Sequence, residues 1–423
     1  MPTSRLVFVY LGIVFLFLIS WQIIDAGSIS QAWADFQPSL YNSATNSTSA
    51  DASCERGNFA TGSNAGSDIS LPPDMKIIGL VFYGRRQYVQ ILDCYLKRNL
   101  KSNGGLFDEV IFAVKTDIEE DVKFLDSIVD TTPGYVKYER ESIKGYGGSW
   151  EVALEHKNDI LIKIDDDVVF IEDNAVSAIV KRLLENPDYF AVSANVINNP
   201  LLSYVHRGLG MYEPFFPEME KPEPEQVNSS SWRVSELPSY DGPRDGPKGF
   251  SINGSTPAPY KGHRWLPVRE RPFDIFKTPA RDIGSEPGKP ALTSWAIAAQ
   301  THYSFFQHLE QGDTHQYKFN TWDYHYHRLS INFLGIRGRD VAECYPFPVG
   351  DDEAYLTLRR PREIGRHLVV DGGGLVAHYA FGPQYHAHGG KGILWTDILD
   401  RYQAYADEMV CPFANRSAKS VVT

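Results

Sequence analysis

Ile160-Leu-Ile-Lys-Ile-Asp165-Asp166-Asp167-Val-Val-Phe-Ile171 places three adjacent carboxylates inside a segment that otherwise has the β-branched, apolar composition of a buried strand. A carboxylate buried alone loses several kcal/mol of solvation, so these acids need a partner, and we expect a divalent cation. Because side chains alternate along a strand, Asp165 and Asp167 are expected to share the cation while Asp166 points the other way. The alternative for such a triplet is a solvated turn or a helix N-terminus.

The segments around this stretch alternate between strand and helix patterns. Such alternation predicts βαβ units and a parallel sheet, in which the acids end the fourth strand. Ligands bind at that carboxyl edge of a sheet. The other predicted strands are 75–82, 108–115, 135–139 and 189–196, and the predicted helices are 88–100, 117–129, 147–156 and 174–185.

Residues 200–292 differ from the rest of the chain, because they hold more than half of all the prolines and show little periodicity. They are predicted to form a long irregular insertion. A loop of this length is either functional, here an acceptor-binding lid, or a surface loop without function. A helix over 293–309 and a strand over 329–334 are predicted to follow it.

The order of strand, helix, strand, helix and then a strand ending in Asp165-Asp-Asp167 resembles the GT-A fold of nucleotide-sugar glycosyltransferases, which carry a DxD pattern. The resemblance covers roughly residues 76–198 and returns in Gly350-Asp-Asp-Glu353 and Leu375-Val-Ala-His-Tyr-Ala-Phe381. The C-terminal region is similar to uncharacterised, membrane-anchored fungal transferases. The resemblance implies an α/β fold, GT-A-like, with a mostly parallel sheet flanked by helices.

The chemistry of sugar transfer asks for a metal site among these acids. Breaking the bond between a sugar and a nucleoside diphosphate leaves negative charge on a phosphate oxygen, which a divalent cation offsets. Asp167 is the expected direct ligand, Asp165 binds the metal or the donor ribose, and Asp166 supports the donor site from behind. By the resemblance, His378 completes the metal site, and an imidazole ligand favours Mn²⁺ over Mg²⁺. The alternative for His378 is an ordinary core histidine.

An inverting transferase also needs a general base beside the acceptor hydroxyl. The resemblance assigns this role to Asp352, with Asp351 as the second candidate. Both acids also suit the N-terminus of a helix that starts near Ala354, where a carboxylate caps the backbone and favours the helix dipole. Capping and catalysis are compatible roles.

Besides Asp165 and Asp166, four further residues are expected to contact the donor. Tyr83, at the end of the first strand, is predicted to stack on the nucleotide base, and Arg85 and Lys144 to meet the diphosphate by charge. Gly147 is predicted to approach it through its backbone N–H. The alternative for the basic residues is a solvated surface. Gly145-Tyr-Gly-Gly148 has neither the dinucleotide-binding nor the P-loop spacing.

The N-terminal region predicts a membrane anchor. Residues 6–24 carry no charge and are long enough to cross a bilayer, so they are predicted to be a transmembrane signal-anchor after a short cytosolic tail, 1–5. A cleaved signal peptide ending near Ala32-Trp-Ala34 is the alternative. A flexible lumenal stem (25–71), a catalytic domain (72–415) and a disordered tail (416–423) are predicted to follow.

Features of the remaining chain agree with the lumen of the Golgi or endoplasmic reticulum. Four cysteines without CxxC spacing favour disulfides over zinc, although their pairing is not readable. Predicted N-glycosylation acceptors are Asn46, Asn228, Asn253 and Asn415.

The predicted activity is therefore the metal-dependent transfer of a sugar from a nucleotide-sugar donor to a glycan or glycoconjugate acceptor. The assignment of a general base predicts inversion at the anomeric carbon. A formal net charge of -12 argues against a nucleic-acid partner. Two alternatives remain: a metal-dependent hydrolase or phosphotransferase, and a non-catalytic glycan-binding protein with the same fold.

Overall fold

The computed structural model describes residues 69–140, 147–223, 231–284, 289–348 and 350–414. The predicted anchor, residues 25–68 of the predicted stem and the predicted tail lie outside these ranges. None of the helices in the described ranges is long and apolar enough to cross a membrane.

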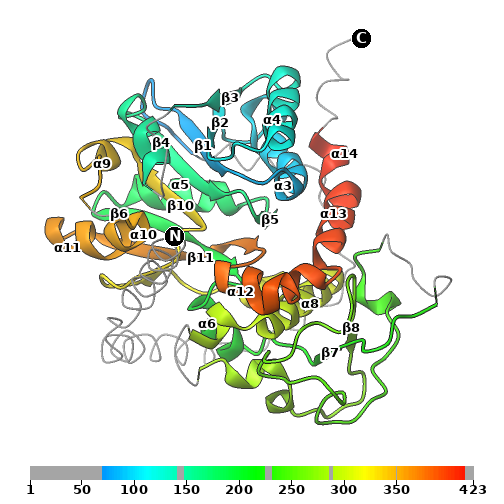
Figure 1. The fold of residues 1–423 in the computed structure, drawn as a ribbon. Helices are drawn as coiled ribbons and strands as arrows, with labels where there is room; N and C mark the ends of the chain where they lie inside the picture. The colour runs from blue at the N-terminus through cyan, green and yellow to red at the C-terminus, as the bar shows by residue number, and fades with distance from the viewer. Residues whose placement is uncertain (1–68, 141–146, 224–230, 285–288, 349, 415–423) are drawn as a thin grey trace, which may run out of the picture. The chain divides into compact units, whose positions relative to one another are not determined.

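A nine-stranded mixed sheet forms the centre of the fold, with strand order β3-β2-β1-β4-β10-β6-β11-β5 and β9 paired to β11 (Figure 1). Six strands run in one direction, and β10, β5 and β9 run against them. The strands are β1 Ile77–Tyr83, β2 Glu109–Val114, β3 Tyr135–Tyr138, β4 Ile160–Asp165, β5 Val168–Ile171, β6 Tyr189–Ile197, β9 Trp322–Asp323, β10 Phe333–Arg337 and β11 His367–His378.

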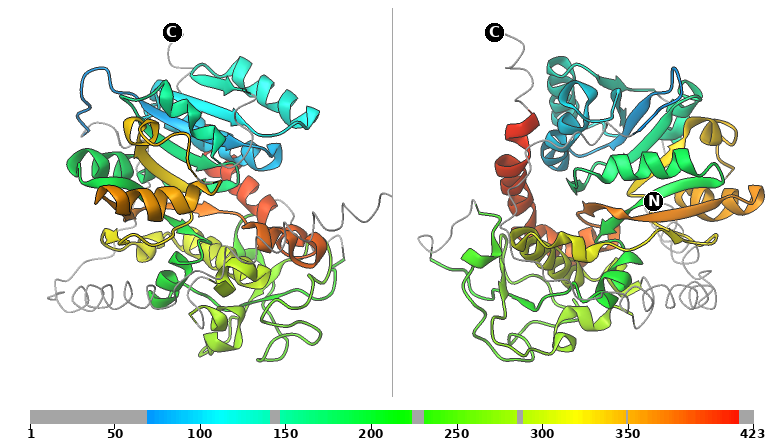
Figure 2. Two further views of the ribbon diagram at one scale, coloured as in Figure 1. Left: turned by 60° about the vertical axis from the view of Figure 1, so that its left-hand side comes forward. Right: turned by 180° about the vertical axis from the view of Figure 1, so that it is seen from behind.

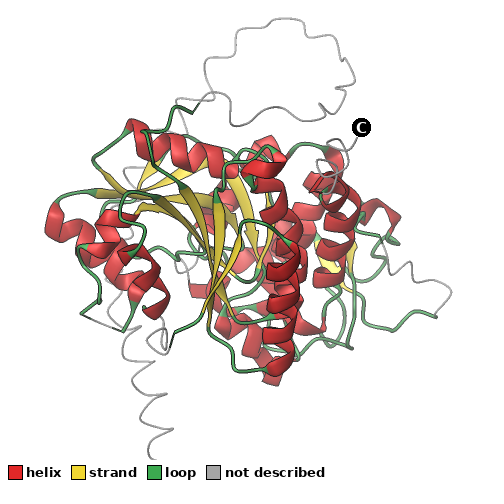
Figure 3. Ribbon diagram, turned by 90° about the horizontal axis from the view of Figure 1, so that it is seen from above, coloured by secondary structure: helices red, strands yellow, loops and turns green. Residues whose placement is uncertain are grey.

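Helices lie on both sides of this sheet (Figure 3). In α3 the buried residues Val89, Leu92 and Leu96 recur at helical spacing and form the face that packs on the sheet. The longer helices are α3 Arg86–Asn99, α4 Glu119–Thr131, α5 Ala175–Glu185, α8 Trp295–Gln311 and α13 Ile398–Met409. The shorter ones are α6 Leu202–Gly208, α7 Lys289–Thr293, α9 Gly338–Ala342, α10 Asp352–Ala354, α11 Arg360–Ile364, α12 Gly382–His386 and α14 Cys411–Ala414.

The acid stretch is not one strand. β4 ends at Asp165, the chain turns through Asp166 and Asp167, and β5 then pairs antiparallel with β11 at the far edge of the sheet. The prediction that the acids end the fourth strand is confirmed. The prediction that their side chains alternate as in a continuous strand is wrong, because Asp166 and Asp167 form a turn. The apolar residues after the acids pair with β11, which lies more than 190 residues further along the chain.

The insertion is folded, although much of its chain is irregular. It contains α6, α7 and a two-stranded sheet of β7 Phe215–Pro217 and β8 Trp265–Pro267. The rings of Phe250, Trp265 and Trp295 form a cluster with centroids 5.7–6.0 Å apart, which packs the insertion against α8. Figure 2 shows the green insertion beside α8 from two sides. α8 is therefore buried on most of its circumference.

Three buried histidines are held in the neutral form. His263 Nδ1 donates to the Trp395 carbonyl at 2.9 Å, while its Nε2 accepts from the Trp265 indole N–H at 3.2 Å. Protonation of His263 would therefore break the bond to Trp265. Burial lowers the pKa of His263 and of His302 to about 4, and that of His206 to about 3.

We expect stability to fall as the pH drops from about 6.5 to 5, because the unfolded chain, with ordinary histidine pKa values, takes up protons first. Each of the three imidazoles adds a slope that grows from about 0.7 kcal/mol per pH unit at pH 6.5 to about 1.4 near pH 5. Thermal melting at several pH values measures the effect. His263→Gln should flatten the dependence and a change of the exposed His386 to glutamine should not; a melting temperature constant over this window would contradict the prediction.

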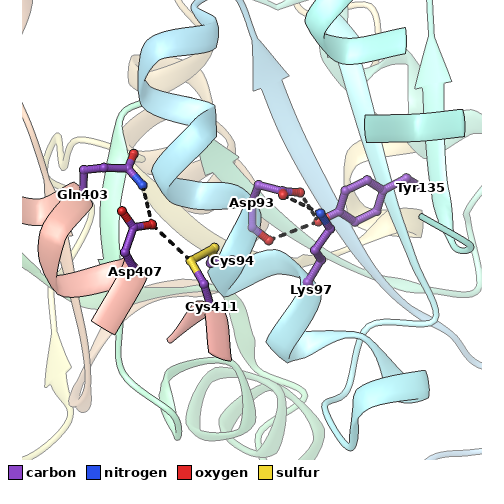
Figure 4. The surroundings of a disulfide bond; sticks show 7 residues. All are labelled: Asp93, Cys94, Lys97, Tyr135, Gln403, Asp407 and Cys411. Atoms are coloured by element: carbon purple, nitrogen blue, oxygen red, sulfur yellow. Dashed lines mark hydrogen bonds and ion pairs between the residues drawn. A yellow bond between two sulfur atoms is a disulfide. The ribbon is translucent and has the colours of Figure 1, made fainter. Parts of the chain in front are cut away.

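A disulfide joins Cys94 of α3 to Cys411 of α14, across 317 residues of sequence (Figure 4). Beside it, the Tyr135 hydroxyl donates to Asp93 at 2.9 Å and Lys97 pairs with the same carboxylate at 2.6 Å. The expectation of disulfides is met for this pair. Cys344 is in no disulfide within the described ranges, and Cys54 lies outside them.

Replacing both Cys94 and Cys411 with serine is expected to lower the free energy of unfolding by about 2–4 kcal/mol, because the cross-link restricts a long loop of the unfolded chain. Denaturant unfolding of the oxidised proteins measures the loss. Cys344→Ser is the matched control and should change little. Equal midpoints for the double variant and the parent chain would contradict the assignment.

Candidate active site and metal centre

The strand order brings the carboxyl ends of β1, β2, β4, β6 and β11 to one edge of the sheet, together with the start of the reversed strand β10. Arg85 follows β1, Lys115 follows β2 and Asp165 ends β4. Asn332 precedes β10, and His378 ends β11. Residues up to about 300 positions apart thus meet at the edge where open α/β sheets bind ligands.

Asp165, Asp167 and His378 are brought together as the sequence predicted, each offering a ligand atom within 4.8 Å of the others. His378 Nε2 lies 3.0 Å from Asp167 Oδ1, and the Tyr379 backbone N–H donates to the Asp167 carbonyl at 2.9 Å. Asp167 and His378 are buried, whereas Asp165 is partly exposed. The end of β11 therefore fixes the imidazole of His378 beside the acid turn, which consists of Asp165, Asp166 and Asp167.

This group fits a divalent cation. It combines two carboxylates with one imidazole, a set that suits a hard or borderline ion. The buried His378 Nδ1 has no hydrogen-bond partner among the described residues, so the ring is not satisfied as a core histidine would be. Metal binding by these residues stays a prediction.

Arg85 contacts both Asp166 and Asp167. Its guanidinium pairs with Asp166, and its Nη2 lies 2.9 Å from Asp167 Oδ2. The Gly84 backbone N–H donates to Asp166 at 3.0 Å, and the guanidinium lies 4.7 Å from the centre of the Tyr88 ring. Arg85 was predicted to meet the diphosphate of the donor. In the structure its guanidinium pairs with the two aspartates.

Burial and charge act in opposite directions on the two buried acids. Burial raises the pKa of Asp166 to about 6 against the opposing charge of Arg85. Burial also acts on Asp167, but His378 and Arg85 together lower the pKa of that carboxyl below its usual range. Asp167 is therefore ionised, as a metal ligand must be.

Two lysines that sequence reasoning missed lie at the same edge. Lys163 is buried, pairs with Asp165 and donates to the Ile331 carbonyl at 2.7 Å. Asn332 Nδ2 donates to the other oxygen of Asp165 at 3.1 Å. A signal was available for Lys163, because it lies two residues before Asp165 in an apolar strand and so points to the same side.

Lys115 is the second missed residue. Its ammonium lies 4.8 Å from the centre of the Phe82 ring, and that of Lys163 lies 4.9 Å from the same ring. Burial lowers the pKa of Lys115, and the charges of Asp352, Asp165 and Asp166 oppose this effect. The pKa of Lys115 thus depends on the charges of both the acid turn and Asp352, the predicted base.

The two candidate bases differ in their surroundings. Asp352 is buried, and its Oδ2 accepts from the Trp150 indole N–H at 2.9 Å. Asp351 instead caps α10 by accepting from the Ala354 N–H at 2.9 Å and pairs with Arg328 at 2.7 Å. Trp150 also packs edge-on against Phe82, at 5.5 Å, beside the strand that ends in Asp165. The surroundings favour Asp352 as the base and Asp351 as the cap.

The structure places the remaining predicted donor-binding residues in different surroundings. Tyr83 is fully buried, packs on Phe112 and donates its hydroxyl to the Asp121 carbonyl at 2.6 Å. The prediction that it stacks on a nucleotide base is therefore wrong, because α4 covers it. Gly147 lies beside Phe347, which a side chain at this position would crowd at 3.2 Å. Lys144 lies outside the described residues.

Of the predicted glycosylation sites, Asn253 is exposed in a turn of the insertion. Its side-chain oxygen accepts from the Ser255 backbone N–H at 2.9 Å. Modification of this residue stays a prediction. Asn46, Asn228 and Asn415 lie outside the described ranges.

Neither a protein-family model nor a curated protein matches the chain. Solved structures of low similarity include GalNAc-T7 with UDP, GalNAc and Mn²⁺, at TM-score 0.34 and 11% identity over 73% of this chain and 44% of that one. Mannosyl-3-phosphoglycerate synthase from Rubrobacter xylanophilus aligns at TM-score 0.24 and 14% identity, over 29% of this chain and 41% of that one. Glucosyl-3-phosphoglycerate synthase from Mycobacterium tuberculosis, solved with Mn²⁺ and UDP, aligns at TM-score 0.24 and 17% identity, over 29% of this chain and 44% of that one. The chain thus spans less than half the length of these three, and likenesses at these TM-scores carry no argument about its activity.

Proposed function

We propose that the chain is a metal-dependent glycosyltransferase of the GT-A type that moves a sugar from a nucleotide-sugar donor to a glycan or glycoconjugate. The observation that carries the proposal is the meeting of Asp165, Asp167 and His378 at the carboxyl edge of the sheet. Lys115 lies at the same edge, and the charges of Asp352, Asp165 and Asp166 all oppose the lowering of its pKa by burial. Metal ligands, a cation for phosphate and a buried carboxylate are the parts that such a transfer requires.

When bound, a divalent cation supplies positive charge that offsets the negative charge on the departing diphosphate. The protein residues around it hold the ligands and the donor. Arg85 keeps the carboxylates of Asp166 and Asp167 in place, and Lys163 orients Asp165. Lys115, which follows β2 at the same edge of the sheet, is proposed to pair with a phosphate oxygen.

Asp352 is proposed as the general base. The acceptor hydroxyl oxygen forms a bond to the anomeric carbon, the bond from that carbon to the phosphate oxygen breaks, and the hydroxyl proton passes to the Asp352 carboxylate. The Trp150 indole N–H fixes one carboxylate oxygen and leaves further lone pairs to accept the proton. A direct displacement of this kind inverts the anomeric configuration.

The cellular setting is proposed from the sequence. A charge-free segment of 19 residues, 6–24, suits a type II anchor in the Golgi or endoplasmic reticulum membrane, with the catalytic domain in the lumen. Acceptor glycans and an oxidising environment for Cys94–Cys411 are both available there.

Calorimetric titration of the full-length chain with UDP and with GDP, each with and without Mn²⁺, tests the proposal. We expect binding of one nucleotide that depends on the metal, followed by transfer from the matching nucleotide sugars in an acceptor screen. Absence of binding by both nucleotides would overturn it. Binding without transfer would favour a glycan-binding protein, and release of free sugar or phosphate without an acceptor would favour a hydrolase.

A further inference from the structure

A second group of metal-binding side chains lies at the other end of β11. Asp323, His325 and His367 each offer a ligand atom within 4.8 Å of the others. His367 begins β11 and His378 ends it, so a strand of 12 residues, roughly 35 Å long, separates this group from the acid turn. The two groups are therefore independent sites.

The pairing of β9 with β11 assembles this second group. Asp323 lies opposite Val369, and the Tyr324 N–H donates to the Leu368 carbonyl at 3.1 Å. The rings of His325 and His367 lie beside each other, with their centroids 5.8 Å apart. The carboxylate of Asp323 and Nδ1 of His367 are in direct contact.

The backbone leaves the strand at His325, with positive φ angles at His325 (47°) and at Tyr326 (61°). Both the backbone N–H and Nδ1 of His325 contact one oxygen of Asp323, at 3.0 and 3.1 Å. His367 Nδ1 contacts the other oxygen. Non-glycine residues rarely adopt this conformation, and such backbone strain is concentrated at functional sites.

One carboxylate between two imidazole nitrogens can be satisfied by protons or by a metal ion. Imidazole with carboxylate suits a borderline transition ion, and three protein ligands with one open position are a familiar arrangement for zinc. The three side chains are 34%, 46% and 37% exposed for Asp323, His325 and His367, so water can complete the coordination. The group lies on the surface, where an ion can enter without rearrangement of the core.

We propose that Asp323, His325 and His367 bind a zinc-class divalent ion that ties β9 to β11. The ligand set distinguishes it from the acid turn, where two carboxylates and one imidazole favour a harder ion. This proposal rests on neither nucleotide binding nor sugar transfer.

The test is titration of the metal-stripped full-length chain with Zn²⁺ against a chromophoric chelator, with melting temperature as a second measurement. His367→Ala and Asp323→Asn are each expected to lower the affinity for one zinc ion by more than about 100-fold. Loss of a residue that only hydrogen-bonds to a metal ligand already lowers metal affinity by about 10- to 100-fold. They should also remove the rise in melting temperature that zinc gives the parent chain.

Two further variants distinguish this group from the acid turn and from nonspecific zinc binding by surface histidines. Asp167→Asn should leave this zinc equivalent intact, even if it removes the other metal site. His386→Ala removes an exposed histidine outside both groups and should change nothing. Equal zinc binding and equal melting by His367→Ala and the parent chain would overturn the proposal, as would loss of all zinc on Asp167→Asn alone.

Discussion

Replacing Asp167 with asparagine is expected to weaken Mn²⁺-dependent nucleotide binding by at least about 100-fold and to lower the rate of sugar transfer by about 1,000-fold or more. Asparagine has the same shape but no charge. The change removes the ionised carboxylate that faces both His378 and Arg85, at 3.0 and 2.9 Å. Calorimetry with UDP and GDP in the presence of Mn²⁺ measures the first effect.

A stability measurement must accompany the Asp167→Asn binding assay. Removing one partner from a buried pair is destabilising, because the remaining charge stays buried. Here Arg85 keeps Asp166 as a partner, so the folded protein should survive the change. Asp130→Asn, at an exposed carboxylate, is the matched control and should leave nucleotide binding unchanged. Undiminished metal-dependent binding by a folded Asp167→Asn protein would remove Asp167 from the metal site.

The first half of the sheet was predictable because its signals are local. The β1, α3, β2, α4 and β3 segments each have their own periodicity and turn residues, and their observed bounds lie within a few residues of the predicted ones. The position of the acids at the end of β4 followed from the same order. What the pattern could not give was the pairing partner of the residues after the acids.

Misjudged features depend on contacts between distant residues. The apolar residues before and after the acid turn have similar composition. Among the described strands, however, β4 pairs with β1 and β10, and β5 pairs with β11 alone. Tyr83 ends a strand at the ligand edge, but α4 covers its ring. Arg85 binds Asp166 across 81 residues, a separation that no local pattern encodes.

Replacing Asp352 with asparagine is expected to lower the turnover of sugar transfer by about 100- to 10,000-fold, the range that general base catalysis contributes. Asparagine still accepts the Trp150 indole N–H but cannot take the proton of the acceptor hydroxyl. Metal-dependent nucleotide binding should be retained, because Asp352 is not among the predicted metal ligands. Steady-state kinetics and calorimetry on the same protein separate the two effects.

The neighbouring residue provides the matched control. Asp351→Asn should lower the free energy of unfolding by less than about 1 kcal/mol, with little change in turnover. Asparagine caps a helix about as well as aspartate, and Arg328 loses only one of its two carboxylate partners. Two adjacent carboxylates on one short helix are thus expected to give opposite results, one in catalysis and one in stability. If Asp351→Asn abolished turnover and Asp352→Asn did not, the base would have to be reassigned, and the burial of Asp352 against Trp150 would have only a structural role.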